Sequence, residues 1–355
     1  MVSAQCVIRE DDSYQELYGF DETLKTIKES IDKLQIEGRS NIAIVSEPFS
    51  GSSELLGKVA GIRPDNTTKI YLRSLVKDKT LFEALTRSGG IVLVDNCHFL
   101  YTRKIGGFQM LDNFLNFIAS SSNTFITTWN IYSWNYLSAL FPLQQIFPLK
   151  IELPKLNSQD LKGMIMSSCE WEMSFEEEQT IQEEKILQFT RIPIEVKPLK
   201  RTLQVPVPAF DYTALKSRLP DRFKGSNKKE TVSVEDKVFN RLLDYSEGNP
   251  GAAKAIWMRS VPRAEGAIKP GDIIKPQYKI DLNYDQAFLL YIILCMESVS
   301  IEELNGIIDP NANVNRSVHD LERTGLISVE NELLSIMPEA LHSIESYLKS
   351  MRLVW

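Results

Sequence analysis

Residues 41–60 have the sequence NIAIVSEPFSGSSELLGKVA, and this stretch decides the fold. It begins with a short run rich in β-branched residues (41–45), passes through a turn that contains Pro and Gly (46–53), and continues as a helix-forming segment (54–60). The pattern predicts a strand, a turn and a helix, in that order. Because the first backbone N–H groups of a helix have no partner inside the helix, such a turn is a natural place for an anion.

The alternation of strands and helices continues to residue 130. Further strands are predicted at residues 68–72, 90–95 and 123–130, and helices at 14–35 and 107–120. Residues 90–95 are apolar on both faces, as a central strand of a parallel sheet must be. Strands that alternate with helices form right-handed βαβ units, so we expect an α/β fold with a parallel sheet flanked by helices.

From residue 157 onward the pattern is helical. Ser158 is the predicted cap of a helix that runs to residue 166, and helices at 234–245 and 252–260 lie on either side of Gly248-Asn-Pro-Gly251. Residues 262–276 have the composition of a linker.

Residues 191–229 form a basic, Pro-rich segment, with ten Lys or Arg against three Asp or Glu. We expect an insertion made of extended strands or a mobile loop. It could meet nucleic acid, an anionic membrane surface or an acidic partner. The alternative is a solvated loop that balances the Glu-rich segment before it.

The C-terminal part is predicted to be compact. Helices are expected at 285–297, 314–323 and 339–351, and strands at 326–329 and 333–336. A further helix is expected to begin at the capping box Ser300-Ile-Glu-Glu303. Gly325 ends the third helix. Three helices followed by a two-stranded wing are the order of a winged helix.

The turn at residues 46–53 partly matches the phosphate-loop pattern G-x-x-x-x-G-K-[ST]. Ser46 replaces the first Gly, Gly51 is retained, Ser52 replaces the Lys, and Ser53 keeps the hydroxyl that would hold magnesium. The backbone amides of residues 50–53 could still hold a phosphate, but the point charge that faces the γ-phosphate is lost. The alternative is that this turn is only a connector.

Polar residues end two of the predicted strands. Asp95 ends the apolar strand, where a carboxylate would orient magnesium, and Asn130 ends the next one. Asn96 follows Asp95 and can position a water but cannot take its proton. A strand-terminal turn without a ligand is the alternative, and the neighbouring Cys97 and His98 are expected to be packed rather than reactive.

These features, in this order, resemble the AAA+ and STAND-type P-loop ATPases, and their replication-initiator-like clade in particular. The resemblance implies that Asn130 is at the sensor-1 position, that residues 153–160 enter the lid, and that Gly248-Asn-Pro-Gly251 begins the sensor-2 helix. It also implies ATP or ADP with Mg as cofactor. The nucleotide-binding residues it implies are Ser46, Ser50, Gly51, Ser52, Ser53, Asn130 and Lys254, with Ser53 and Asp95 on magnesium.

The resemblance also divides the chain. Residues 1–155 are expected to form the P-loop domain, residues 156–262 a helical lid with the basic insertion at about 191–229, and residues 277–355 a winged-helix domain.

Three groups that split ATP in this family are replaced here. Ser52 occupies the position of the Walker A Lys, and Asn96 occupies the position of the Walker B Glu. Gly251 occupies the position of the sensor-2 Arg, and Lys254 follows one helical turn later. We therefore expect a regulatory or scaffolding pseudo-ATPase whose nucleotide binding is weak or lost and whose hydrolysis is lost. The alternatives are an active ATPase that uses Lys58, Lys254 or a neighbouring subunit's Arg, and a DNA-binding winged-helix factor.

Charge argues against the DNA-binding alternative. The formal net charge is -7, and residues 281–355 contain four Lys or Arg against twelve Asp or Glu. The expected third helix carries Arg316, His319 and Arg323 beside Asp320 and Glu322. Because neutralisation of phosphates supplies most non-specific DNA affinity, we expect a protein partner at the winged helix or lid.

The composition of the chain predicts a cytoplasmic localisation. The four Cys are far apart and there are only three His, so free thiols in a reducing compartment are expected and a zinc site is not. No signal peptide is visible, and the longest apolar run, residues 287–296, is about half of what a bilayer span needs.

Overall fold

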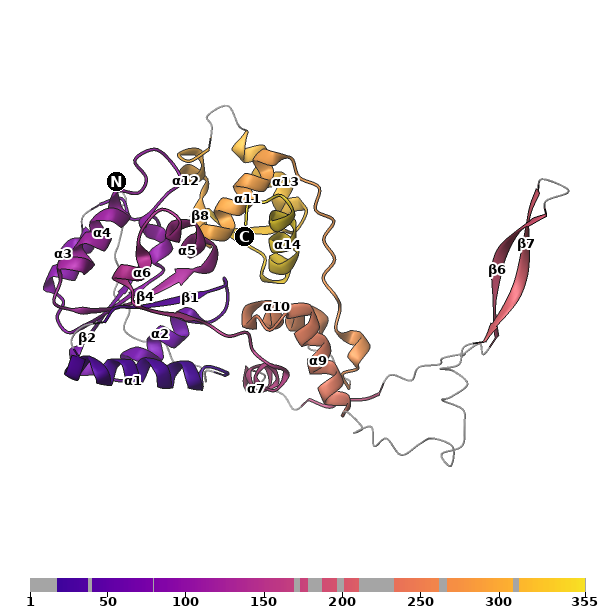
Figure 1. The fold of residues 1–355 in the computed structure, drawn as a ribbon, viewed down its shortest axis with the longest axis horizontal. Coiled ribbons are helices and arrows are strands. Elements are labelled where there is room, and N and C mark those ends of the chain that lie inside the picture. The colour runs from indigo at the N-terminus through magenta and orange to yellow at the C-terminus, as the bar shows by residue number, and fades with distance from the viewer. Residues whose placement is uncertain are drawn as a thin grey trace.

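The computed structural model describes residues 18–37, 40–78, 80–168, 173–177, 187–196, 201–210, 233–261, 267–308 and 313–354. A five-stranded, wholly parallel sheet forms the centre of the N-terminal part, in the strand order β2-β3-β4-β1-β5 (Figure 1). The strands are β1 (Ile42–Ser46), β2 (Thr67–Tyr71), β3 (Ile91–Asp95), β4 (Thr124–Asn130) and β5 (Leu149–Glu152). The predicted α/β fold is therefore confirmed.

The helices of this part are α1 (Asp21–Glu37), α2 (Ser52–Ala60), α3 (Thr80–Arg87), α4 (Gln109–Ser120), α5 (Ile131–Ser138) and α6 (Leu143–Ile146). The prediction of a helix from residue 14 is wrong at residues 18–20, because Gly19 has φ +76 and the helix begins only at Asp21. Residues 14–17 lie outside the described part. The sequence pattern missed α3, α5, α6 and the edge strand β5.

The two faces of the sheet contact different helices. Ala43, Val45, Val92 and Val94 belong to a buried cluster that also contains the core of the C-terminal part. Their sequence neighbours, such as Ile44 and Leu93, belong to a second cluster with α1, α2 and the lid helices. Because successive side chains of a strand point to opposite faces, each strand is buried from both sides.

The described residues of the segment that we expected to be a lid, called the lid below, form α7 (Ser158–Ser168), α9 (Val234–Ser246) and α10 (Pro250–Ser260). The prediction that Ser158 caps α7 is wrong: the side-chain oxygen of Asn157 accepts from the amides of Gln159 and Asp160, both at 2.9 Å. The expected linker is also more ordered than its composition suggests. Within its described residues, 267–276, Ile268 and Ile273 are buried in the lid core, next to the short helix η4 (Pro270–Asp272).

Part of the basic insertion forms an antiparallel pair, β6 (Leu187–Val196) with β7 (Arg201–Phe210). This agrees with the extended-strand version of the prediction for those residues. Residues 197–200 and 211–229, which carry much of the basic charge, lie outside the described part, so the role of that charge stays a prediction.

The C-terminal part has the winged-helix order. Its elements are α11 (Tyr284–Met296), β8 (Val299–Ser300), α12 (Ile301–Asn305), α13 (Val314–Arg323), β9 (Ile327–Glu330), β10 (Leu333–Ile336) and α14 (Leu341–Ser350). The strands form a sheet in the order β8-β10-β9, and the capping box of Ser300 and Glu303 is confirmed. Gly325 has φ +72 just beyond α13, as expected for a helix stop. Among the described residues, no helix is both long and apolar enough to cross a bilayer.

Candidate functional site

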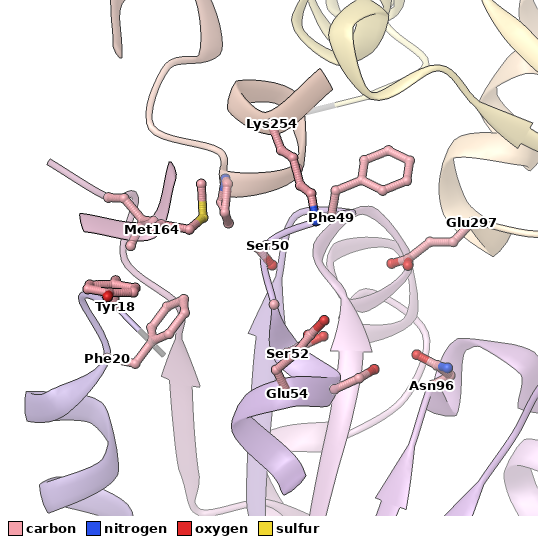
Figure 2. A pocket seen from close by; sticks show the side chains of 15 residues that line it. Tyr18, Phe20, Phe49, Ser50, Ser52, Glu54, Asn96, Met164, Lys254 and Glu297 are labelled. Carbon is pink, nitrogen blue, oxygen red and sulfur yellow. The ribbon is translucent and has the colours of Figure 1, made fainter. Parts of the chain in front are cut away.

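A pocket of about 400 Å³ opens at the turn that follows β1. It is lined by residues from five separate parts of the chain: the segment before α1, the turn and first residues of α2, the end of β3, the lid, and the C-terminal part (Figure 2). Of the residues predicted for a nucleotide, Ser50, Gly51, Ser52, Ser53 and Lys254 line this pocket. The residues of the linear motif and the pocket therefore lie at the same edge of the sheet.

The turn after β1 leaves the first residues of α2 facing the pocket. Phe49 has φ 63 and Gly51, which precedes the helix, has φ 87. A left-handed residue directly before the helix lets the chain reverse sharply, which is what Gly permits without strain. Ser50 donates from its hydroxyl to the Glu47 carbonyl at 2.6 Å, which closes the turn. Ser46 is buried at the end of β1 and does not line the pocket.

One end of the pocket is apolar and aromatic. Tyr18 and Phe20, which precede α1, lie there beside Leu156 and Met164 of the lid (Figure 2). The packing is tight, since a Cβ on Gly163 would lie 2.6 Å from the Tyr18 ring. A flat, apolar wall of this kind can accept the face of a heterocyclic base. These four residues carry no recognisable sequence signal, because they come from segments outside the phosphate-loop motif.

Helix α10 packs directly onto the turn. The Gly251 amide donates to the Phe49 carbonyl at 3.0 Å, and Asn249 Nδ2 donates to the Pro48 carbonyl at 2.8 Å. A Cβ on Gly251 would lie 2.4 Å from the Phe49 Cβ. The contact therefore excludes any side chain at the position where the resembled family carries Arg.

Lys254 lies one turn further along α10, and its side chain extends from the helix toward the turn (Figure 2). It is the single basic residue among the described residues that line the pocket, against the carboxylates of Glu54 and Glu297. Lys58 does not line the pocket. Lys155, in the lid entry, forms ion pairs with Glu47 at 3.1 Å and with Glu247 at 3.3 Å.

Asp95 lies behind the turn and is 1% exposed. Its Oδ1 accepts from the Thr128 hydroxyl and from the backbone amide of Asn96 at 3.1 Å, and Asp95 is not among the residues that line the pocket. Burial raises the pKa of Asp95, and hydrogen bonds from Ser53, Thr128 and Asn96 oppose that rise. The structure thus brings together Ser53 and Asp95, the two residues predicted for magnesium. In the described part of the chain, no group of three or more His, Cys, Asp or Glu could hold a metal on its own.

The predicted sensor residue Asn130 is engaged in the structure. Its Oδ1 accepts from the Tyr132 amide at 2.9 Å, which begins α5. Its Nδ2 donates to the Leu294 carbonyl and to Glu297 Oε1, both at 2.9 Å. Asn130 is 1% exposed and does not line the pocket. It therefore joins the end of β4 to the C-terminal part.

Glu297, the residue after α11, lines the pocket from the C-terminal part and was not predicted. Burial raises its pKa to about 7, against the hydrogen bond from Asn130 and with a further rise from the charge of Asp95. Asn96, also in the pocket lining, donates through its side-chain amide to the Leu72 carbonyl at 3.2 Å. Cys97 and His98 are both buried, as expected, and burial lowers the pKa of His98 to about 3.

We predict that Glu297→Gln stabilises the protein at alkaline pH. The folded pKa of about 7 exceeds the ordinary value of 4.5, so the folded state holds a proton that the unfolded state releases, and stability falls as pH rises through this window. At about 1.4 kcal/mol per pKa unit, the variant should gain up to about 3 kcal/mol at pH 8 relative to pH 4.5. Urea unfolding of the wild-type protein and of Glu297→Gln at several values of pH in this range measures the difference in their free energies of unfolding. A difference that stays constant with pH would contradict the burial of this charge.

We predict that Gly251→Ala loosens the contact between α10 and the turn. The new methyl group meets the Phe49 Cβ and carbonyl, so we expect a loss of about 1–3 kcal/mol in the free energy of unfolding. Gly89→Ala is the matched control, because a Cβ there meets nothing within 4 Å. Equal stability of the two variants in urea would show that α10 does not rest on the turn.

Comparison with known proteins identifies no family for this chain. No protein-family model matches the chain, and no curated protein matches it. Among solved structures, the RuvB Holliday junction branch migration motor of Thermotoga maritima is similar at 15% identity and a TM-score of 0.40, over 94% of this chain and 95% of that one. The ORC2 protein of Aeropyrum pernix, in ADPNP and ADP complexes, is similar at 10% identity and a TM-score of 0.40, over 97% of each chain. The structure itself has a parallel sheet with a strand–turn–helix unit of the P-loop kind at β1 and α2, followed by C-terminal elements in the winged-helix order.

Proposed function

We propose that this protein is a regulatory or scaffolding member of the AAA+/STAND type that holds a nucleotide weakly and does not hydrolyse it. The observation that carries the proposal is the charge of the pocket. Its described lining has one cation, Lys254, and two carboxylates, Glu54 and Glu297. A triphosphate needs several positive charges near it to be bound tightly and split. This lining offers one, which is offset by Glu54 and, above its pKa of about 7, also by Glu297.

The shape of the pocket supports a nucleotide as the ligand. A base would lie against Tyr18 and Phe20, and its phosphates would meet the first amides of α2, with Lys254 above them. The buried carboxylate of Asp95, together with the Ser53 hydroxyl that hydrogen-bonds to it, suits a magnesium ion, which prefers carboxylate and hydroxyl oxygens. Bound magnesium would neutralise part of the phosphate charge.

The same site lacks the groups for hydrolysis. Asn96 cannot accept a proton from water, and its amide already donates to the Leu72 carbonyl. Ser52 provides no charge at the position of the missing Lys, and the packing of Gly251 on Phe49 leaves no room for an Arg. Each loss removes stabilisation of the transition state rather than of the fold.

Isothermal titration with ADP and ATP, with and without magnesium, tests the proposal. We expect dissociation constants above about 10 μM, corresponding to binding weaker than about −7 kcal/mol. Lys254→Ala should weaken binding about tenfold or more, because it removes the pocket's cation, whereas Lys58→Ala, outside the pocket lining, should leave it unchanged.

Steady-state ATP hydrolysis is the second measurement. We expect no turnover above background with the wild-type protein. Turnover of about one per second or faster, an ordinary enzyme rate, would contradict the proposal and favour an ATPase that uses non-standard residues.

For the partner, we propose a protein rather than DNA. On α13, Arg316, His319 and Arg323 are exposed, but Glu322 is exposed among them and Asp320 pairs with Arg323 at 4.0 Å. We predict no shift of duplex DNA in a gel at low salt, where phosphate attraction is strongest. A salt-sensitive shift that disappears on neutralising the basic residues of 191–229 would instead support the DNA-binding alternative.

A further inference from the structure

We infer that Glu297 makes the pocket select a nucleoside diphosphate over a triphosphate. This selectivity rests on the proposed nucleotide function, and one residue of the C-terminal part then decides whether a diphosphate or a triphosphate binds. Figure 2 shows the arrangement: the aromatic residues Tyr18 and Phe20 lie on one side of the turn and Glu297 on the other.

The order of groups along the pocket decides which phosphate meets Glu297. A base at the aromatic end places its first phosphates over residues 50–53, at the start of α2. Continuing in the same direction, a third phosphate reaches the side of the pocket lined by Glu297 and Asn96, with buried Asp95 behind it. When it is ionised, the Glu297 carboxylate at that end repels a terminal phosphate strongly and the first two phosphates, which lie farther away, much less.

Glu297 is held in this position by several contacts. Asn130 Nδ2 donates to its Oε1 and to the Leu294 carbonyl, and the Ser133 hydroxyl donates to the Cys295 carbonyl at 2.8 Å. Glu297 itself has φ 59, a left-handed conformation that the following chain must accommodate. The carboxylate therefore cannot withdraw without breaking the contact between the end of α11 and the start of α5.

A second contact fixes α11 to the N-terminal part. The Arg103 guanidinium lies over the ring of Tyr136 at 4.1 Å and over the ring of Tyr291, on α11, at 4.8 Å. Tyr291 is buried, so this stacking is largely shielded from water and stronger than an exposed cation–π pair. Because α11 is held both near its middle, at Tyr291, and at its end, we expect the repulsion to weaken binding of the ligand rather than to displace the Glu297 side chain.

Titration of three proteins with ADP and ATP at about pH 8.5, where Glu297 is ionised, in the absence and presence of magnesium, tests the inference. The proteins are wild type, Glu297→Gln and Glu302→Gln. The first substitution removes the charge and keeps an oxygen that accepts from Asn130, whereas the second removes a charge from an exposed carboxylate of the same part outside the pocket lining.

We expect wild type and Glu302→Gln to bind ADP at least tenfold more tightly than ATP. In Glu297→Gln the two affinities should become similar through a gain for ATP, with ADP unchanged. Glu297→Ala provides a second test of the same change, and thermal melts establish that each variant is folded.

Three outcomes overturn the inference. Equal affinity of wild type for ADP and ATP removes the selectivity while leaving the proposed nucleotide function in place. Weaker binding of magnesium–ATP by Glu297→Gln would show that the Glu297 carboxylate helps to hold the metal. ATP turnover by the wild-type protein that Glu297→Gln abolishes would show that this carboxylate acts as a general base. Failure of every protein to bind either nucleotide overturns the proposed function as well.

Discussion

The hydrogen bonds of Asn130 connect the parts of this molecule on which the site depends. Its side-chain oxygen accepts from the first amides of α5, directly after the central strand β4. Its side-chain nitrogen donates to the Leu294 carbonyl of α11 and to the carboxylate of Glu297, the residue after α11. Because Asn130 is buried, losing one partner would leave a polar group without water to replace it. The end of the parallel sheet is thereby tied to the C-terminal winged helix, 167 residues away in sequence.

The hydrogen bond between Asn130 and Glu297 changes which polar groups face the pocket at this edge of the sheet. In a site built for a triphosphate, a polar residue at the end of this strand would face the ligand. Here it faces Glu297, and the carboxylate that it holds lines the pocket instead. The negative charge of Glu297 therefore belongs to the site only because the C-terminal part is docked against the sheet. Movement of that part would therefore change the charge of the pocket.

The opposite side of the pocket depends on close backbone packing. The Gly251 amide and the Asn249 side chain donate to the carbonyls of Phe49 and Pro48, so that the lid helix α10 rests on the turn after β1. The absence of a side chain at Gly251 makes this approach possible. The same absence removes the cation of the resembled family, and Lys254 is the one that remains in the described lining. The missing side chain of Gly251 therefore explains both the close contact between α10 and the turn and the absence of a cation at this position.

The sequence by itself determined the elements that have a strong local pattern: the buried strands β1, β3 and β4, the turn before α2, and the capped helices of the C-terminal part. It did not reveal β5, a four-residue edge strand whose pairing with β1 decides its conformation, or α5, whose aromatic residues are poor helix formers and which begins at the Asn130 cap. It placed Ser50 to Ser53, Asn96 and Lys254 at one pocket, because a phosphate loop is contiguous in sequence and the ends of parallel strands share one edge. Only the tertiary structure decided that Tyr18, Phe20, Met164 and Glu297 complete that pocket, since burial and charge at a site depend on segments that no spacing in the sequence relates.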